Sequence, residues 1–251
     1  YLLKGQFVPQ NLFEALRYIK MAADHGNAQA MFEYGLILYK GEITTMNKEE
    51  AIHYYKKSAE KGNSNAMNNY ALMLARGEGI QSNKEEACHF FKKAAEKGNI
   101  SAMINYCWIV DDDEINDSIG YLKIAAKKGS SSLINEFGKK LYNGIDGILM
   151  NKRKSAIFFK IAADHGNIDA MTNYATILYN GEGVKIDKKE ANYYFKIAAN
   201  KGNSNAMHHY SQALMKGDGV QMNKNEALCY LKMSADKGNP DAMFEYGMML
   251  L

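Results

Sequence analysis

The chain has 251 residues, of which 24% are charged and 47% are apolar, as in a folded protein and unlike a disordered tail. Its net charge of +3 is too small to indicate a nucleic-acid partner, and the absence of any long apolar run predicts no membrane insertion. The three cysteines lack the spacing of a zinc site or a disulfide framework, which favours free thiols in a cytoplasmic protein.

A glycine preceded by lysine or histidine recurs along the chain at intervals of 31 to 37 residues: Gly26, Gly62, Gly98, Gly129, Gly166, Gly202 and Gly238. The heptapeptide KGNSNAM occurs at 61–67 and again at 201–207 because these copies lie four repeats apart. Periods of this length are typical of solenoids built from helix pairs, in which each repeat buries its apolar face against its neighbours.

The repeat from 63 to 98 shows how each pair begins and ends. Gly62 suits the left-handed residue that ends the preceding helix, and Asn63 can cap a first helix (helix A) that runs to about Arg76. After a turn, Asn83 can cap a second helix (helix B), with Glu86 reaching back in a capping box. The same pair recurs as Asn11/Glu14, Asn47/Glu50, Asp187/Glu190 and Asn223/Glu226.

Two later repeats depart from this pattern. The repeat after Gly98 has the acidic segment 111–118 in place of a G-x-G turn and is five residues short, so we expect its helix A to end early. The acidic run 111–114 suits the entrance of a helix B, where negative charge complements the helix dipole. The next repeat adds a residue between Gly144 and Gly147, and Lys154 replaces the capping-box glutamate.

On a helical wheel, helix A separates into two arcs. With the alanine of each helix A (Ala66, for example) as position 1, positions 1, 5, 8 and 9 cluster as the Ala, Tyr and Leu/Met packing face. The periodic methionines therefore indicate core packing and not a ligand-binding stripe. Positions 3, 4, 7 and 11 fall on the opposite arc, where the copies differ from one another.

The pattern A-x-x-x-[YL]-[GA]…G-x-G-[VI]…[ND]-x-x-E-A-x-x-[YF][YF]-K-x-A-A-x-x-G-N resembles the Sel-one-like repeats (SLR), relatives of the tetratricopeptide repeat, over essentially the whole chain. The resemblance implies an all-α fold, an α-solenoid of antiparallel helix pairs forming a right-handed superhelix. We expect a single array over residues 1–251, with seven repeats of about 36 residues, truncated at both ends.

In related tetratricopeptide arrays helix A lines the concave face and holds peptide ligands, so the variable arc is the candidate groove. It supplies our candidate ligand-binding residues: Asn68, Asn69, Leu72, Asn105, Trp108, Asn135, Lys139, Asn173, Thr176, His208, His209 and Gln212. The asparagines could meet the backbone of an extended peptide, since an amide both donates and accepts; they could equally be solvated surface positions. Trp108 could anchor a ligand or fill the space left by the missing turn.

No catalytic arrangement is present. The sequence has no P-loop, no G-x-S-x-G elbow, no H-E-x-x-H and no dinucleotide fingerprint, and the repeated G-x-G is best explained as a turn. The neighbours His208 and His209 lack the carboxylate or thiolate ligands of a metal site. We therefore expect no enzyme activity, no cofactor and no bound metal.

The resemblance implies a non-catalytic interaction scaffold or adaptor that binds a protein or peptide partner. The alternative is the regulatory or substrate-docking region of a larger signalling enzyme such as a protein kinase. The chain begins inside a repeat and its last helix, from Pro240, carries Phe244, Tyr246 and Leu250 with no helix B after it. We therefore expect self-association through exposed terminal repeats.

Overall fold

The computed structural model describes residues 11–251, apart from the side chain of Asp117. It divides into two compact units, an N-terminal half that ends at Tyr121 and a C-terminal half from Leu122 to Leu251, and each is considered by itself. All regular structure in the described part of the chain is helical, with fourteen α-helices and no strand, so the all-α prediction is confirmed.

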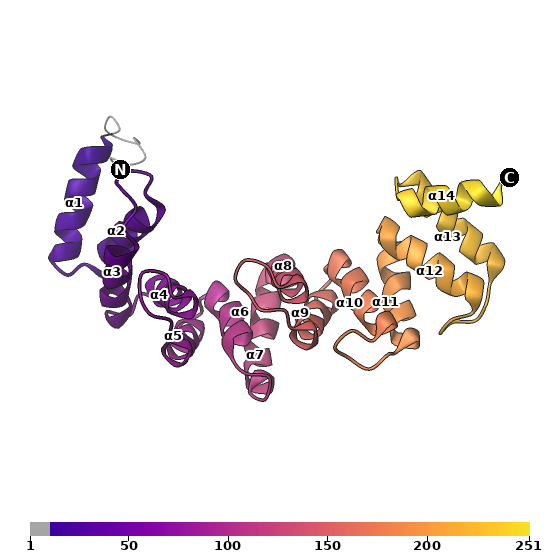
Figure 1. The fold of residues 1–251 in the computed structure, drawn as a ribbon, viewed down its shortest axis with the longest axis horizontal. Coiled ribbons are helices and arrows are strands. Elements are labelled where there is room, and N and C mark those ends of the chain that lie inside the picture. Colours follow the sequence, from indigo (N-terminus) through magenta and orange to yellow (C-terminus); the bar gives the residue numbers. More distant parts are fainter. Residues whose placement is uncertain (1–10) are drawn as a thin grey trace. The chain divides into compact units, whose positions relative to one another are not determined.

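In the N-terminal half, helices B and A alternate along the chain and each packs on the next (Figure 1). Their bounds are α1 (Leu12–Asp24), α2 (Ala28–Lys40), α3 (Lys48–Glu60), α4 (Ser64–Arg76), α5 (Lys84–Glu96), α6 (Ile100–Ile109) and α7 (Ile115–Ala125), the last of which crosses the boundary. Helices α2, α4 and α6 are A helices. The pairing confirms an α-solenoid, and its expected right-handed superhelix stays a prediction.

The C-terminal half continues the same alternation. It contains the π-helical segment η1 (Ala126–Ser130), α8 (Ser131–Asn143), α9 (Lys152–Asp164), α10 (Ile168–Asn180), α11 (Lys188–Asn200), α12 (Ser204–Lys216), α13 (Lys224–Asp236) and α14 (Pro240–Met249). Here α8, α10, α12 and α14 are A helices. The last of them exposes Phe244 and Met248, and Leu250 directly after it is also exposed. The expected self-association through this surface stays a prediction.

The predicted helix boundaries are confirmed. Gly62 has φ of 95°, a left-handed conformation that an L-residue adopts only with strain. The Asn63 side chain accepts from the backbone N–H of Ala66 at 2.9 Å and so satisfies one of the free donors at the start of α4. In the shortened repeat α6 ends early, at Ile109, as expected.

The capping-box prediction was wrong in one detail. The backbone N–H of Asn83 donates to the Leu74 carbonyl at 3.0 Å and does not need Glu86. Glu86 accepts instead from the Tyr70 hydroxyl at 2.8 Å and from the Asn83 amide at 3.5 Å. The glutamate of the motif therefore ties helix B to its own helix A as well as to the cap.

The boundary before α8 differs from the others. Gly129 keeps the left-handed φ of 87°, but the chain around it is π-helical and Ser130 makes no side-chain cap. The other described A helices each begin with an asparagine cap, whereas α8 has Ser130 at that position. This change coincides with the repeat that has lost its turn.

The asparagine caps also connect neighbouring repeats, and the duplicated heptapeptide contains both residue positions that make this connection. While Asn63 Oδ1 caps α4, its Nδ2 donates to Gln29 Oε1 of the previous helix A at 3.0 Å. The equivalent bonds are Asn99 to Asn65 (2.8 Å), Asn167 to Ser132 (3.3 Å), Asn203 to Asp169 (3.1 Å) and Asn239 to Asn205 (2.7 Å). In KGNSNAM the first asparagine thus bonds backward and the second accepts from the next repeat.

A second inter-repeat contact involves the acidic residue of the G-x-G turn. Glu78 accepts from Tyr39 at 2.9 Å and from Lys48 at 2.8 Å, both in the preceding repeat. The same clamp recurs with Glu182, Tyr142 and Lys152, and with Asp218, Tyr179 and Lys188. Hydrogen bonds from Lys152 and Tyr142 lower the pKa of Glu182 to about 2. The turn therefore has a packing role that the sequence pattern alone did not suggest.

Candidate functional site

The variable arc of helix A divides into a buried part and an accessible part. The candidates at position 3 are buried: Asn68, Asn135 and His208 expose 7%, 2% and 6% of their surface, whereas Phe244 at the same position of α14 is 70% exposed. The wheel placed these candidates on the open groove face, but the neighbouring A helix covers them. Positions 4 and 7 are mostly half-buried, so they are the part of the arc that a ligand can reach.

The asparagines pair neighbouring A helices with each other. Asn105 at position 4 donates to Asn68 at position 3 of the preceding repeat, at 2.9 Å. Asn173 donates in the same way to Asn135 at 3.0 Å. Asn105 is itself 3% exposed. These amides therefore form an inter-repeat ladder, which is neither of the two roles considered from sequence.

The remaining candidates occupy separate places along the two halves. Trp108 is half-buried and its ring centroid lies 6.5 Å from that of Phe91, so it packs on the aromatic residue of the preceding helix B. In the C-terminal half, Lys139 forms an ion pair with Glu136 at 2.9 Å. Thr176 donates to the Thr172 carbonyl of its own helix at 2.9 Å.

Asn69 and Leu72 do line a cavity, which we call the Tyr55 pocket. It lies between α2 and α4, over α3, and has a volume of about 150 Å³. Its lining residues are Leu36, Tyr39, Lys40, Tyr55, Asn69, Leu72, Met73, Arg76 and Glu78. Two consecutive A helices thus form the walls, and a residue of the intervening helix B forms the floor.

The floor residue Tyr55 has a buried hydroxyl without a hydrogen-bond partner. The residue is 1% exposed, and Gly35 of α2 allows its ring to approach closely, since a Cβ there would lie 2.9 Å from Tyr55 Cδ1. Burial raises the pKa of Tyr55 to about 12, an effect that the nearby Asn69 amide opposes. The hydroxyl is therefore protonated at neutral pH and remains a donor.

The rim of the Tyr55 pocket is charged. Lys40 and Arg76 form long ion pairs, at 3.5 Å with Glu42 and at 3.6 Å with Glu78. Burial would raise the pKa of Glu78, but hydrogen bonds from Lys48 and Tyr39 outweigh it and lower that pKa. The carboxylate of Glu78 is thus already neutralised, which leaves positive charge in excess at the rim.

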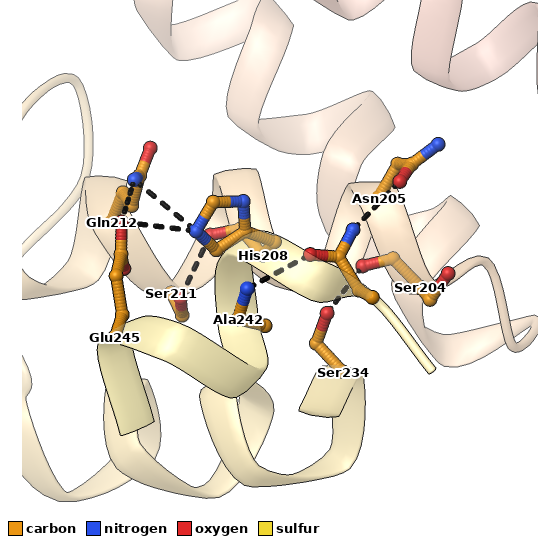
Figure 2. Close-up of polar contacts among 9 residues, drawn as sticks. Ser204, Asn205, His208, Ser211, Gln212, Ser234, Ala242 and Glu245 are labelled. Carbon is orange, nitrogen blue, oxygen red and sulfur yellow. Dashed lines mark hydrogen bonds and ion pairs between the residues drawn. The ribbon is translucent and has the colours of Figure 1, made fainter. Parts of the chain in front are cut away.

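An equivalent cavity of about 220 Å³, the Leu231 pocket, lies in the C-terminal half between α12 and α14. Its lining residues are Ser211, Gln212, Met215, Lys216, Leu231, Glu245 and Met249. Figure 2 shows Gln212 and His208 reaching toward Glu245, at 2.7 and 3.1 Å. Of the candidates, Gln212 therefore lies in a pocket wall and His208 beside it.

His209 covers an equivalent floor residue instead of lining an open pocket. Its ring stacks on Phe195 with centroids 5.0 Å apart. Burial, with a contribution from His208, lowers the pKa of His209, so the ring is neutral at physiological pH. At this repeat the position 4 side chain therefore covers the floor residue, whereas Asn69 leaves space over Tyr55.

Tyr55 was absent from the sequence candidates. The available signal was the residue seven places before each repeat glycine, which reads Ile19, Tyr55, Phe91, Leu122, Phe159, Phe195 and Leu231. Tyrosine is the one polar member of this mostly buried series. In the repeat motif it belongs to the [YF][YF] pair, and only a comparison of that position between copies distinguishes it from the phenylalanines.

No three His, Cys, Asp or Glu side chains between residues 11 and 251 converge as a metal site requires. In that same part of the chain, every helix is too short or too polar to cross a bilayer.

A family model described as the Sel1 repeat matches the sequence at residues 1–27, 28–63, 64–99, 138–167, 168–203 and 204–239. These matches cover most of the chain and leave out the region of the shortened repeat. A comparison with curated protein sequences finds no match.

Among solved structures, the chain is similar to a protective antigen of uropathogenic Escherichia coli that displays an SLR fold. The two are 26% identical with a TM-score of 0.60, over 99% of this chain and 54% of the antigen. A Sel1 repeat protein from Oxalobacter formigenes is also 26% identical, with a TM-score of 0.49, over 99% of this chain and 62% of that one. The chain thus spans little more than half the length of these relatives.

Proposed function

This chain belongs to the Sel1 repeat family, and from that premise we propose that it is a non-catalytic adaptor that binds a segment of a partner protein along the groove face of its A helices. Repeat arrays of this family generally act as protein-interaction scaffolds. The finer assignment, to the groove face, rests on the arrangement of positions 4 and 7.

The Tyr55 pocket is the observation that carries this proposal. Leu36 and Leu72, both at position 7 of consecutive A helices, face one cavity together with Asn69 at position 4. An extended peptide crossing the repeats could place one side chain there while its backbone runs over the A helices. Pockets for individual side chains are the usual source of specificity in peptide recognition.

The alternative of a regulatory region in a larger signalling enzyme has no feature in the described residues that favours it over an adaptor. Only the interaction role is therefore proposed.

A display library of random peptides selected on the immobilised protein tests the proposal. Leu72→Arg should abolish binding of the selected peptides, because a guanidinium would occupy the Tyr55 pocket. Lys92→Glu on the exposed face of α5 should leave binding unchanged and serves as the matched control. Leu36→Arg on the facing helix is a second groove variant, and thermal melts confirm that each variant is folded.

Peptides that bind both groove variants as tightly as the wild type, or that lose binding only with Lys92→Glu, would place the interaction surface on helix B. That result would refute the groove assignment.

A further inference from the structure

Building on the proposed function, we infer that the Tyr55 pocket is a specificity pocket for a glutamate side chain of the bound segment. The groove could in principle accept many peptides. The walls of the pocket favour an apolar stem, the floor favours a hydrogen-bond acceptor and the rim favours a negative charge.

The floor supplies an unused donor. The Tyr55 hydroxyl is buried without a partner, and a buried hydroxyl that makes no hydrogen bond is destabilising for the protein alone. Such groups are rare in native proteins, and a missing ligand is one physical explanation for them. The hydroxyl itself exposes almost no surface, so an acceptor seated in the pocket satisfies it once the side chains beside it move slightly aside.

Asn69 adds a second donor beside the first. Its Oδ1 accepts from Asn68 Nδ2 at 3.3 Å, and its Nδ2 faces the Tyr55 oxygen closely enough to oppose the rise in the pKa of Tyr55, which leaves one further N–H of that Nδ2 to donate. A carboxylate has only acceptor sites, so it can accept hydrogen bonds from Tyr55 and Asn69 at once. An amide or hydroxyl side chain would add a donor of its own. The pair of donors therefore favours a carboxylate over glutamine or serine.

The walls and the volume limit the length of the occupant. Leu36, Leu72 and Met73 are apolar and suit the methylene groups of a side chain. A cavity of about 150 Å³ holds a few waters or one medium side chain. Glutamate has two methylenes between the backbone and its carboxylate, which lets the charge reach a buried floor that aspartate would not reach.

The rim supplies charge complementarity. Lys40 and Arg76 are held only by ion pairs of 3.5 and 3.6 Å, and Glu78 is already bonded to Lys48 and Tyr39. A glutamate passing between Lys40 and Arg76 gains attraction that a neutral side chain lacks, which exceeds the opposing effect of the single Glu33 carboxylate near Tyr55.

The Leu231 pocket has apolar walls and a rim lysine, Lys216, but it lacks the floor donor and the uncharged position 4. Its floor is a leucine, and its rim carries the carboxylate of Glu245, which would repel a second acid. Glutamate selection is therefore expected at the Tyr55 pocket and not at its equivalent in the C-terminal half.

Two display libraries that differ only at a fixed central residue, glutamate or leucine, test the inference. The wild type should enrich the glutamate library. Tyr55→Phe removes only the hydroxyl and should fold normally, because α5, α9 and α11 carry phenylalanine at the equivalent position. It should weaken selected glutamate peptides by about tenfold to a hundredfold, the loss of one charge-assisted hydrogen bond, and leave leucine peptides unchanged.

The outcomes separate this inference from the proposed function. If Tyr55→Phe leaves glutamate peptides unaffected while Leu72→Arg abolishes their binding, the glutamate assignment is wrong and the groove stands. Equal enrichment of the two libraries by the wild type would also overturn the assignment. If neither variant weakens any peptide, the groove proposal fails as well.

Discussion

Tyr55 in the N-terminal half and Leu231 in the C-terminal half form the floors of two pockets built from equivalent residues. In each, position 7 of one A helix and position 4 of the next contribute to the walls. They differ in the floor side chain and in the charge at position 4, which is neutral in Asn69 and negative in Glu245. The comparison teaches that the repeat determines where a pocket lies, while two variable positions determine what it can bind.

The largest expected effect concerns the glycine above the Tyr55 floor, whose equivalent above Leu231 is Ser211. Gly35→Ala should destabilise the protein by about 1–3 kcal/mol, because its Cβ would lie 2.9 Å from the Tyr55 ring. Gly247→Ala, at the same position of α14, has no atom within 4 Å and should stabilise by about 0.5–1 kcal/mol through helix propensity, so it serves as the control. Urea unfolding of both variants measures the difference, and equal effects would show that close packing of the Tyr55 ring on Gly35 contributes nothing measurable.

The next effect concerns Asn63, which begins a pocket-wall helix. Asn63→Ala should lower the free energy of unfolding by about 0.5–2 kcal/mol, because α4 loses both its cap and the bond from Asn63 to Gln29. Asn63→Asp keeps a capping oxygen but removes the donor, so it should cost less, about 0.5–1.5 kcal/mol. If Asn63→Asp unfolds at the same urea concentration as the wild type, the inter-repeat bond contributes nothing measurable.

A smaller, pH-dependent effect on stability is expected from Glu78 at the rim of the Tyr55 pocket. The pKa of Glu78 is lower in the folded state than in the unfolded state. Its ionised form therefore stabilises the fold fully above the unfolded pKa of about 4.3, and this stabilisation is lost as the pH falls through the folded pKa. Glu78→Gln should cost roughly 0.5–1 kcal/mol at pH 7, allowing for solvent screening, and progressively less in acid. Chemical denaturation at pH 7 and below pH 4 checks this, and a cost that does not fall with pH would contradict the clamp.

The smallest expected effect on stability is that of Tyr55→Phe. Because the hydroxyl is buried and unpartnered, its removal should leave stability unchanged or raise it by up to about 1 kcal/mol. Phe195→Leu, by contrast, should lower the free energy of unfolding, because the smaller side chain leaves a cavity beneath His209. A melting temperature of Tyr55→Phe well below that of the wild type would mean that the hydroxyl has a structural partner.

The features that could be predicted from the sequence are local ones. The left-handed Gly62 and the Asn63 cap follow from residues within one turn of each other, as does the early end of α6. The helix A packing face also follows from periodicity alone. Each of these depends on side chains and backbone groups that lie a few residues apart.

What the sequence did not reveal depends on contacts about 30 to 40 residues apart. A wheel places Asn68 opposite the packing face, but it does not include the neighbouring A helix whose Asn105 buries it. Whether a floor residue is covered likewise depends on the next repeat, since His209 covers Phe195 while Asn69 leaves space over Tyr55. Comparing equivalent positions between copies is the step that would have singled out Tyr55.

The most direct test of the adaptor proposal is the methyl NMR spectrum of the protein during titration with a selected peptide. The account predicts that the methyl signals of Leu36, Leu72 and Met73 shift together, while those of Leu228 and Met233 on the exposed side of α13 do not. Shifts confined to the exposed methyl groups of the B helices, with Leu36 and Leu72 unchanged at saturation, would contradict binding in the groove.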